Sequence, residues 1–188
     1  MQANHHLNFP YVKNINVKIF LTGKPRSGKS TVVLKLIELL KEKGIKVGGF
    51  ITPEIRERGR RVGFYVKDIS SNEMEIFASE DFKIGPKIGK YGIDVKVFER
   101  IAFKALDFAI ENCDLIVIDE IGKMEFLSEE FKRRIYELVL IEKPLVAVLH
   151  RNFVKKFKDF GEVIEVTEKD RKVLPKKLVE KILSYIKK

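Results

Sequence analysis

Residues 23–30 read Gly-Lys-Pro-Arg-Ser-Gly-Lys-Ser and match the pattern G-x-x-x-x-G-K-[ST] without a gap. They lie between an apolar run at 17–21 and a helical pattern that begins at Thr31. In that context the pattern is typical of a loop whose backbone N–H groups hold phosphate groups. Lys29 would neutralise the β and γ oxygens of a nucleoside triphosphate, and Ser30 would bind Mg²⁺. The predicted nucleotide-binding residues of this segment are Gly23, Lys24, Pro25, Arg26, Ser27, Gly28, Lys29, Ser30 and Thr31.

A second chemical signal is the apolar run at 115–118, which ends in Asp119 and Glu120. Such a run predicts a buried parallel strand that delivers carboxylates to the sheet edge where ligands bind. Asp119 is placed to hold Mg²⁺ opposite Ser30. Because side chains alternate along a strand, we expect Glu120 to point the other way and to orient or deprotonate the attacking water. This predicts hydrolysis; the alternative is an acidic strand end that caps the next helix.

Two further candidates follow from neighbouring segments. His150 comes directly after the apolar run at 145–149 and is a candidate to sense or orient the γ-phosphate. Four arginines lie at 56–61, and one of them would stabilise transition-state charge from within the chain. We select Arg56 for that role. The alternatives are a structural histidine and an ordinary solvated loop.

The order of apolar and helical patterns predicts an α/β fold, because strands and helices alternate as in parallel βαβ units. The segment 61–78 breaks the alternation with two strand-like runs around a polar turn, which indicates an inserted antiparallel hairpin. A Gly-rich stretch at 84–92 is either a mobile lid or a plain connection. We expect a tail at 1–16 and a single domain over 17–188.

Composition limits the possible partners and location. The formal net charge is +10, from 37 Lys and Arg against 27 Asp and Glu. No aromatic-interleaved or Arg-rich motif accompanies this charge, and Lys- and Glu-rich surfaces also occur in proteins from hot environments, so specific nucleic-acid binding is not expected. Without a long apolar run or a signal-peptide layout, we expect a cytoplasmic monomer with no membrane segment. The lone Cys113 predicts packing rather than catalysis.

Taken together, five blocks resemble the thermophile-type and cancer-related nucleoside-triphosphatases, small P-loop proteins. The resemblance spans nearly the whole chain. The blocks are 23–31, 49–56, 61–64, 88–92 and 117–125.

The resemblance implies a RecA-like P-loop NTPase core with mostly parallel strands, flanking helices and an inserted hairpin. It also implies Mg²⁺-dependent release of phosphate from ATP, GTP, CTP and UTP, with little base selectivity. It assigns nucleotide binding to a second set of residues: Leu115, Ile116, Val117, Ile118, Asp119, Glu120, Ile121 and Gly122.

The chain departs from the family pattern at two positions. Arg26 stands where the family usually has Gly, so the loop either reaches its conformation without that φ freedom or gains a phosphate contact. Asp170 precedes Arg171 where the family tends to have Asn. If this segment borders the base, base preference would differ here.

Two other functions fit the same motifs. A P-loop kinase would pass the γ-phosphoryl group to a bound nucleoside or nucleic-acid acceptor, over which the segment 85–92 could close. A nucleotide-gated module that binds RNA or protein would turn over slowly until a partner stimulates it. Phosphate release from ATP without any acceptor distinguishes hydrolysis from phosphoryl transfer.

Overall fold

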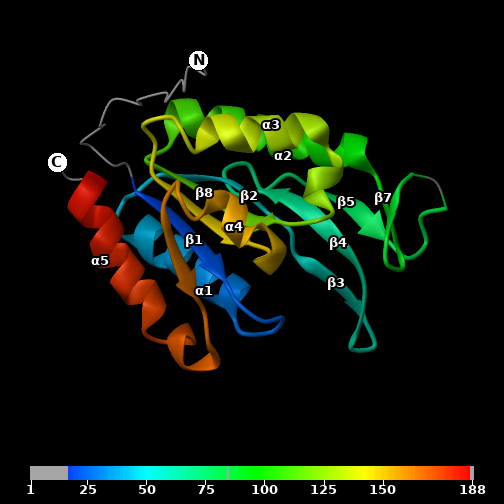
Figure 1. The fold of residues 1–188 in the computed structure, drawn as a ribbon, viewed down its shortest axis with the longest axis horizontal. Helices are drawn as coiled ribbons and strands as arrows, with labels where there is room; N and C mark the ends of the chain where they lie inside the picture. Colours follow the sequence, from blue (N-terminus) through cyan, green and yellow to red (C-terminus); the bar gives the residue numbers. More distant parts are fainter. Residues whose placement is uncertain (1–16, 84, 187–188) are drawn as a thin grey trace, which may run out of the picture.

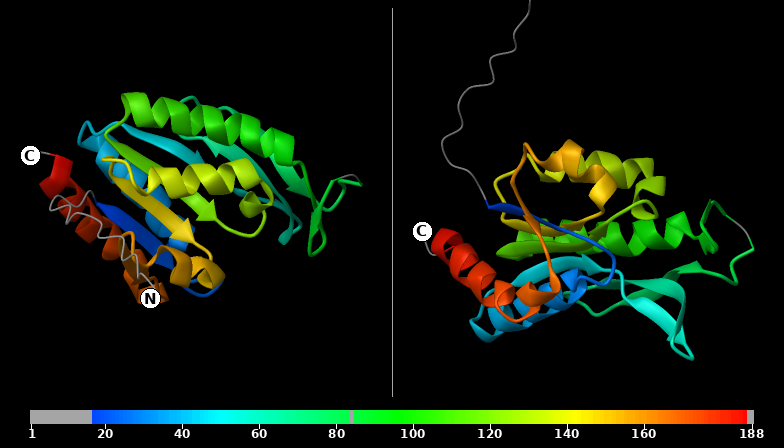
Figure 2. Two further views of the ribbon diagram at one scale, coloured as in Figure 1. Left: turned by 45° about the horizontal axis from the view of Figure 1, so that its top comes forward. Right: turned by 60° about the horizontal axis from the view of Figure 1, so that its bottom comes forward.

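The computed structural model describes residues 17–83 and 85–186, and the expected N-terminal tail at 1–16 lies outside them. Ten strands of the described residues form one mixed sheet, in the order β10-β1-β9-β8-β2-β4-β5-β7-β6 with β3 paired to β4 (Figure 1). Helices lie on both faces of this sheet (Figure 2). The predicted α/β fold class is therefore confirmed.

The parallel half of the sheet contains the strands that the apolar runs predicted. Successive neighbours along it pair in parallel, from the edge strand β10 to β2. Parallel pairing brings the carboxyl ends of all these strands to one edge of the sheet, where open α/β sheets bind ligands. The strands are β1 (Lys18–Thr22), β2 (Val47–Ile51), β8 (Leu115–Ile121), β9 (Leu145–Leu149) and β10 (Glu162–Glu165).

The antiparallel half extends further than the hairpin expected over 61–78. That hairpin corresponds to β4 (Arg60–Asp68) and β5 (Met74–Ser79), which pair antiparallel. Three shorter strands join it: β3 (Glu54–Glu57), β6 (Lys87–Ile88) and β7 (Tyr91–Ile93). Strands of two to four residues are too short to give a periodic signal, so the sequence pattern missed them.

The helices divide between the two faces of the sheet. Helices α1 (Lys29–Glu42) and α5 (Leu174–Ile186) cover one face, and α2 (Val95–Asn112) and α3 (Glu129–Leu138) cover the other (Figures 1 and 2). Shorter helical turns are η1 (Glu125–Leu127), η2 (Arg151–Phe153), α4 (Val154–Phe157) and η3 (Glu168–Arg171). Among the described residues, no helix is both long enough and apolar enough to cross a membrane.

An aromatic cluster ties the central strand β2 to the helices α2 and α3. Phe50 makes edge contacts with Phe98 and Phe131, with ring centroids 5.5 and 5.7 Å apart. All three rings are fully buried. Such aromatic pairs stabilise beyond the area that they bury. They fix the sheet against two helices and so hold the strand ends that carry the polar loops.

Candidate active site

The phosphate loop connects β1 to α1, and its lysine folds back across it. Lys29 Nζ donates hydrogen bonds to the carbonyl oxygens of Gly23, at 3.0 Å, and Lys24, at 2.8 Å. Gly28, the residue that precedes α1, has a φ of +104°, a conformation that glycine adopts without strain. Burial lowers the pKa of Lys29, while the charges of Glu120 and Asp119 oppose that shift. The ammonium group is thus held over the loop next to two acids.

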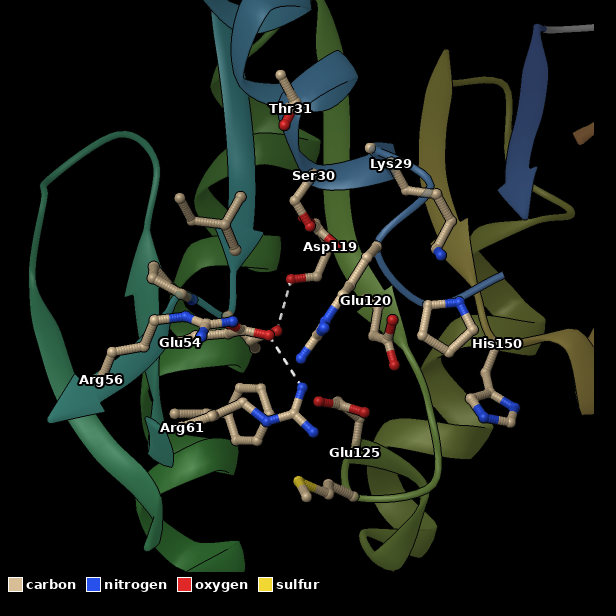
Figure 3. A pocket seen from close by; sticks show the side chains of 18 of the residues that line it. Lys29, Ser30, Thr31, Glu54, Arg56, Arg61, Asp119, Glu120, Glu125 and His150 are labelled. Carbon is tan, nitrogen blue, oxygen red and sulfur yellow. Dashed lines mark hydrogen bonds and ion pairs between the residues drawn. The ribbon is translucent and has the colours of Figure 1, made fainter. Parts of the chain in front are cut away.

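A cavity of about 1160 Å³ lies at the carboxyl ends of the parallel strands. Figure 3 shows Lys29, Ser30, Asp119 and Glu120 around it. The phosphate loop, the loop after β8 and the β3–β4 hairpin all contribute walls to this cavity. Residues of both predicted motifs therefore lie around one cavity.

Asp119 and Glu120 both line the cavity, although strict alternation would send them to opposite faces of the sheet. The β8–β9 pairing shifts register between Ile118 and Ile121, so β8 carries one extra residue there. A bulge of this kind redirects side chains. Both carboxylates thus reach the cavity at the strand end, and the bulge falls within the segment that carries them.

Burial changes the acidity of both carboxyl groups. It raises the pKa of Asp119 to about 6, against the opposing effects of the Ser30 hydroxyl and the Lys29 charge. Burial and the neighbouring charge of Asp119 raise the pKa of Glu120 to about 7. A carboxyl group with a pKa near neutrality is suited to accept a proton from water.

A third acid, Glu125, lies beside Glu120. It begins η1, is only 4 % exposed and lines the same cavity. Burial and the charge of Glu120 raise the pKa of Glu125 well above its ordinary value. Gly122 separates the two side chains, and a Cβ there would stand 2.6 Å from Glu120 Oε1 and 2.7 Å from Glu125 Oε2.

Three arginines of the β3–β4 hairpin line the cavity, and two of them, Arg56 and Arg61, share the carboxylate of Glu54. Arg56 donates to Glu54 through Nε and Nη2, and to the carbonyl of Gly59 through Nη1. Arg61 donates to Glu54 through Nη1, at 2.9 Å, and to the Tyr91 hydroxyl through Nε, at 3.0 Å. Figure 3 shows the guanidinium group of Arg61 next to Glu125.

The charge of Arg61, and not that of the selected Arg56, is among the causes that set the pKa of Glu120, the proposed base. The positive charge of Arg61 lowers the pKa of Glu120 and so favours its ionised form. The hydrogen bonds of Arg56 occupy all three of its nitrogens. Both arginines line the cavity.

His150 lines the cavity at the end of β9. Its Nδ1 accepts a hydrogen bond from the backbone N–H of Asn152, which leaves Nε2 to carry the proton of the neutral ring. Burial, helped by the positive charges of Lys123, Arg151 and Lys29, lowers the pKa of His150. A neutral imidazole at this position can donate one hydrogen bond to a phosphate oxygen.

Comparison with known proteins agrees with this geometry. A family model described as NTPase matches residues 18–179. The chain is 45 % identical over 172 residues to the nucleoside-triphosphatase THEP1 of Methanocaldococcus jannaschii, covering 91 % of this chain and 100 % of that protein. The chain belongs to this NTPase family. It is also 42 % identical to the nucleoside-triphosphatase THEP1 of Korarchaeum cryptofilum, over 90 % of this chain and 89 % of that one.

Two solved NTPase structures share the fold. The crystal structure of THEP1 from Aquifex aeolicus matches with a TM-score of 0.76 and 28 % identity, over 88 % of this chain and 99 % of that chain. The solution structure of a human cancer-related nucleoside triphosphatase matches with a TM-score of 0.72 and 30 % identity, over 90 % and 98 %. These matches confirm the resemblance that the sequence motifs indicated.

In this NTPase the structure brings only part of the second predicted set to the cavity. Of residues 115–122, Asp119 and Glu120 line it, and Gly122 leaves free the space beside the Glu120 carboxylate. The other members are completely buried side chains within the sheet, where they form the core: Leu115, Ile116, Val117, Ile118 and Ile121. Asp170 does not line the cavity, because its carboxylate accepts hydrogen bonds from the backbone and hydroxyl of Thr167.

Sequence reasoning missed several residues of the NTPase cavity. Three of them lie in the segments that carry the family resemblance: Glu54, Tyr91 and Glu125. No spacing rule links these residues to the phosphate loop. Arg171 contacts the loop from a segment more than 140 residues away. Only the tertiary structure could place these residues at the site.

The donor set of the cavity fits Mg²⁺. Mg²⁺ prefers oxygen ligands and keeps several waters, so one or two protein ligands beside the phosphates are sufficient. The Ser30 hydroxyl lies close enough to the Asp119 carboxylate to lower its pKa, which places two suitable oxygens together. Within 17–83 and 85–186, no cluster of three or more His, Cys, Asp or Glu side chains could hold a metal by itself. A metal bound jointly with a nucleotide fits this arrangement.

Proposed function

We propose that this NTPase hydrolyses nucleoside triphosphates to diphosphates and phosphate in a Mg²⁺-dependent reaction. The observation that carries the proposal is the meeting of Lys29 with Asp119 and Glu120 around one cavity. A phosphate-binding cation, a candidate metal ligand and a candidate base are thus in reach of one triphosphate. Family membership supports the reaction class.

Binding depends on the loop and its lysine. Backbone N–H groups at 26 and 28–30, which include the N-terminus of α1, would hold the phosphate oxygens. Lys29 would leave the Gly23 and Lys24 carbonyls to meet the β and γ oxygens. Ser30 and Asp119 would hold Mg²⁺. When bound, Mg²⁺ supplies electrostatic stabilisation of the charge on the transferring phosphoryl group.

Glu120 would accept the proton of the attacking water. It lies next to the metal ligand Asp119, and its pKa of about 7 keeps a substantial carboxylate fraction at neutral pH. Arg61 lowers the pKa of Glu120 and so favours the carboxylate form that acts as base. His150 Nε2 would donate a hydrogen bond to the γ-phosphate.

The proposed substrates are ATP, GTP, CTP and UTP. The residues with proposed roles all act on the triphosphate, the metal or the water, which these four nucleotides share. Selection against one base would need hydrogen bonds to base edges, and none of the proposed roles supplies them. We therefore propose similar turnover of all four nucleotides.

Phosphate release from each nucleotide, with Mg²⁺ or with a chelator and without any acceptor, tests the proposal. We expect release with Mg²⁺ only. The variant Lys29→Ala should lose at least about 100-fold in rate, because it removes the charge that offsets the β and γ oxygens. Lys35→Ala is the matched control, since Lys35 is exposed on the same helix and pairs with Glu38.

Two outcomes contradict the proposal. If the protein releases no phosphate but transfers the γ-phosphoryl group to an added acceptor, it is a kinase. If Lys29→Ala hydrolyses ATP as fast as the unaltered protein, the phosphate loop does not bind the substrate. Thermal unfolding of Lys29→Ala should match that of Lys35→Ala, which separates lost chemistry from lost folding.

A further inference from the structure

Arg171, at the end of η3, forms hydrogen bonds with the phosphate loop. Its Nε donates to the Ser27 carbonyl at 3.1 Å, and its Nη2 donates to the Arg26 carbonyl. The turn that presents it is fixed locally, because Asp170 accepts two hydrogen bonds from Thr167, each of 2.7 Å. A planar guanidinium group thus bridges two successive carbonyls of the loop.

The same side chain packs against the last glycine of the motif. A Cβ on Gly28 would stand 2.3 Å from Arg171 Nε and 2.6 Å from its Cγ. Gly28 therefore lacks a side chain for two reasons: its φ of +104° and the presence of Arg171 against its Cα. The Arg171 side chain thus occupies the space that a side chain at position 28 would need.

A hydrogen bond that fixes a backbone carbonyl also fixes the N–H group of the same peptide unit. The peptide unit is planar, and its C=O and N–H point in opposite directions. A hydrogen bond to the Ser27 carbonyl therefore sets the direction of the Gly28 N–H, one of the groups that would hold phosphate. The bond to the Arg26 carbonyl likewise constrains the Ser27 N–H, which donates to the Lys24 carbonyl at 3.2 Å within the loop.

Arg26 makes this constraint necessary. Its φ is +64°, in the left-handed region that residues other than glycine rarely adopt. Such a residue persists there only when its surroundings hold it. The hydrogen bond from Arg171 to the Arg26 carbonyl is an interaction that can hold it.

We propose that Arg171 is a positioning residue that holds the phosphate loop in its nucleotide-binding conformation by bridging the Arg26 and Ser27 carbonyls. This inference rests on the proposed function, since it assigns the loop to the phosphates. Arg171 acts through the loop and not on the reacting atoms. It should therefore change nucleotide affinity more than the rate of the chemical step.

Calorimetric titration with ADP tests the bridge without turnover. Arg171→Met should raise the Kd for ADP about tenfold, because two charge-assisted hydrogen bonds that order the loop are lost. The KM for ATP should rise in parallel, with kcat changed by less than roughly threefold. Lys172→Met is the matched control, because it removes an exposed positive charge from the next position and should leave Kd unchanged.

Two further variants separate geometry from charge. Arg171→Lys should recover only part of the affinity, because an ammonium group cannot reproduce the planar fork. Arg26→Gly should lower the Kd of Arg171→Met more than it lowers that of the unaltered protein, since glycine adopts the loop conformation without support. Thermal unfolding without nucleotide should show that all variants fold.

The outcomes are distinct. Unchanged ADP affinity in Arg171→Met, full recovery in Arg171→Lys, or an equal effect of Arg26→Gly in both backgrounds would each overturn the bridge. If the unaltered protein binds no ADP, the proposed function fails and the bridge fails with it. If the unaltered protein binds ADP and Arg171→Met binds it equally well, the bridge alone fails.

Discussion

Glu120 Oε1 and Glu125 Oε2 lie 2.6 and 2.7 Å from the point where a Cβ on Gly122 would stand. The glycine thus provides the space in which two buried carboxyl groups approach each other. Their proximity is part of the reason that the pKa of Glu125 is raised so far. The position of the proposed base therefore depends on the absence of a side chain two residues further along the chain.

Gly122→Ala should displace the Glu120 carboxylate without unfolding the protein. A misplacement of about 1 Å at a catalytic group costs up to about 100-fold, so kcat should fall at least tenfold with little change in KM. Steady-state kinetics with ATP measures this. Gly44→Ala is the control for a general loss of stability, because its φ of +76° strains an alanine at the end of α1, where a Cβ meets nothing within 4 Å. An unchanged kcat in Gly122→Ala would show that Glu120 needs no such space.

Glu120→Gln and Asp119→Asn should separate chemistry from metal binding. The first keeps size and hydrogen bonding but removes the base, so ATP with Mg²⁺ should still bind while hydrolysis falls by roughly two to four orders of magnitude. Asp119→Asn should weaken Mg²⁺-dependent binding as well, and excess Mg²⁺ should recover part of its rate. Normal turnover by Glu120→Gln would make His150 the next candidate to activate water.

Arg61→Met should lower kcat more than Arg56→Met does. The methionine keeps some of the packing over Phe64, whose ring centroid lies 5.1 Å from the Arg61 guanidinium carbon, but loses the charge near Glu120. Removal of an arginine that supports transition-state charge costs about 1000-fold or more in the strongest cases, and we expect roughly ten- to 100-fold here because Arg61 is partly exposed. Equal losses of kcat in both variants would contradict a special role of Arg61. They would mean that the two arginines, joined through Glu54, act together.

The rate should depend on pH through Glu120. Its pKa is raised to about 7, and the base acts in its ionised form, so kcat/KM should rise as the pH increases through 7 and level off above it. In Arg61→Met the midpoint should move to higher pH, because Arg61 favours the ionised carboxylate. In Arg56→Met the midpoint should stay at the pH of the unaltered protein. A pH profile that is flat between 5 and 9 would exclude Glu120 as the base.

The sequence by itself determined the parallel core and the two nucleotide motifs. The phosphate loop was recognisable because its glycines, lysine and serine are adjacent in the chain, and their local conformation needs few distant partners. Asp119 was recognisable because a run of four buried apolar residues leads to it. Apolar periodicity also located α1 and α2, since one face of each must be buried.

The tertiary structure decided what lies around those motifs. The bulge in β8 depends on pairing with β9 and lies in the segment that brings Asp119 and Glu120 to the cavity. The choice of Arg61 over Arg56 depends on Glu54 and Tyr91, and Arg171 reaches the loop from η3. These relationships join residues that are distant in the chain, or depend on which strands pair. Local propensity contains no record of such contacts, because they form only when the sheet assembles.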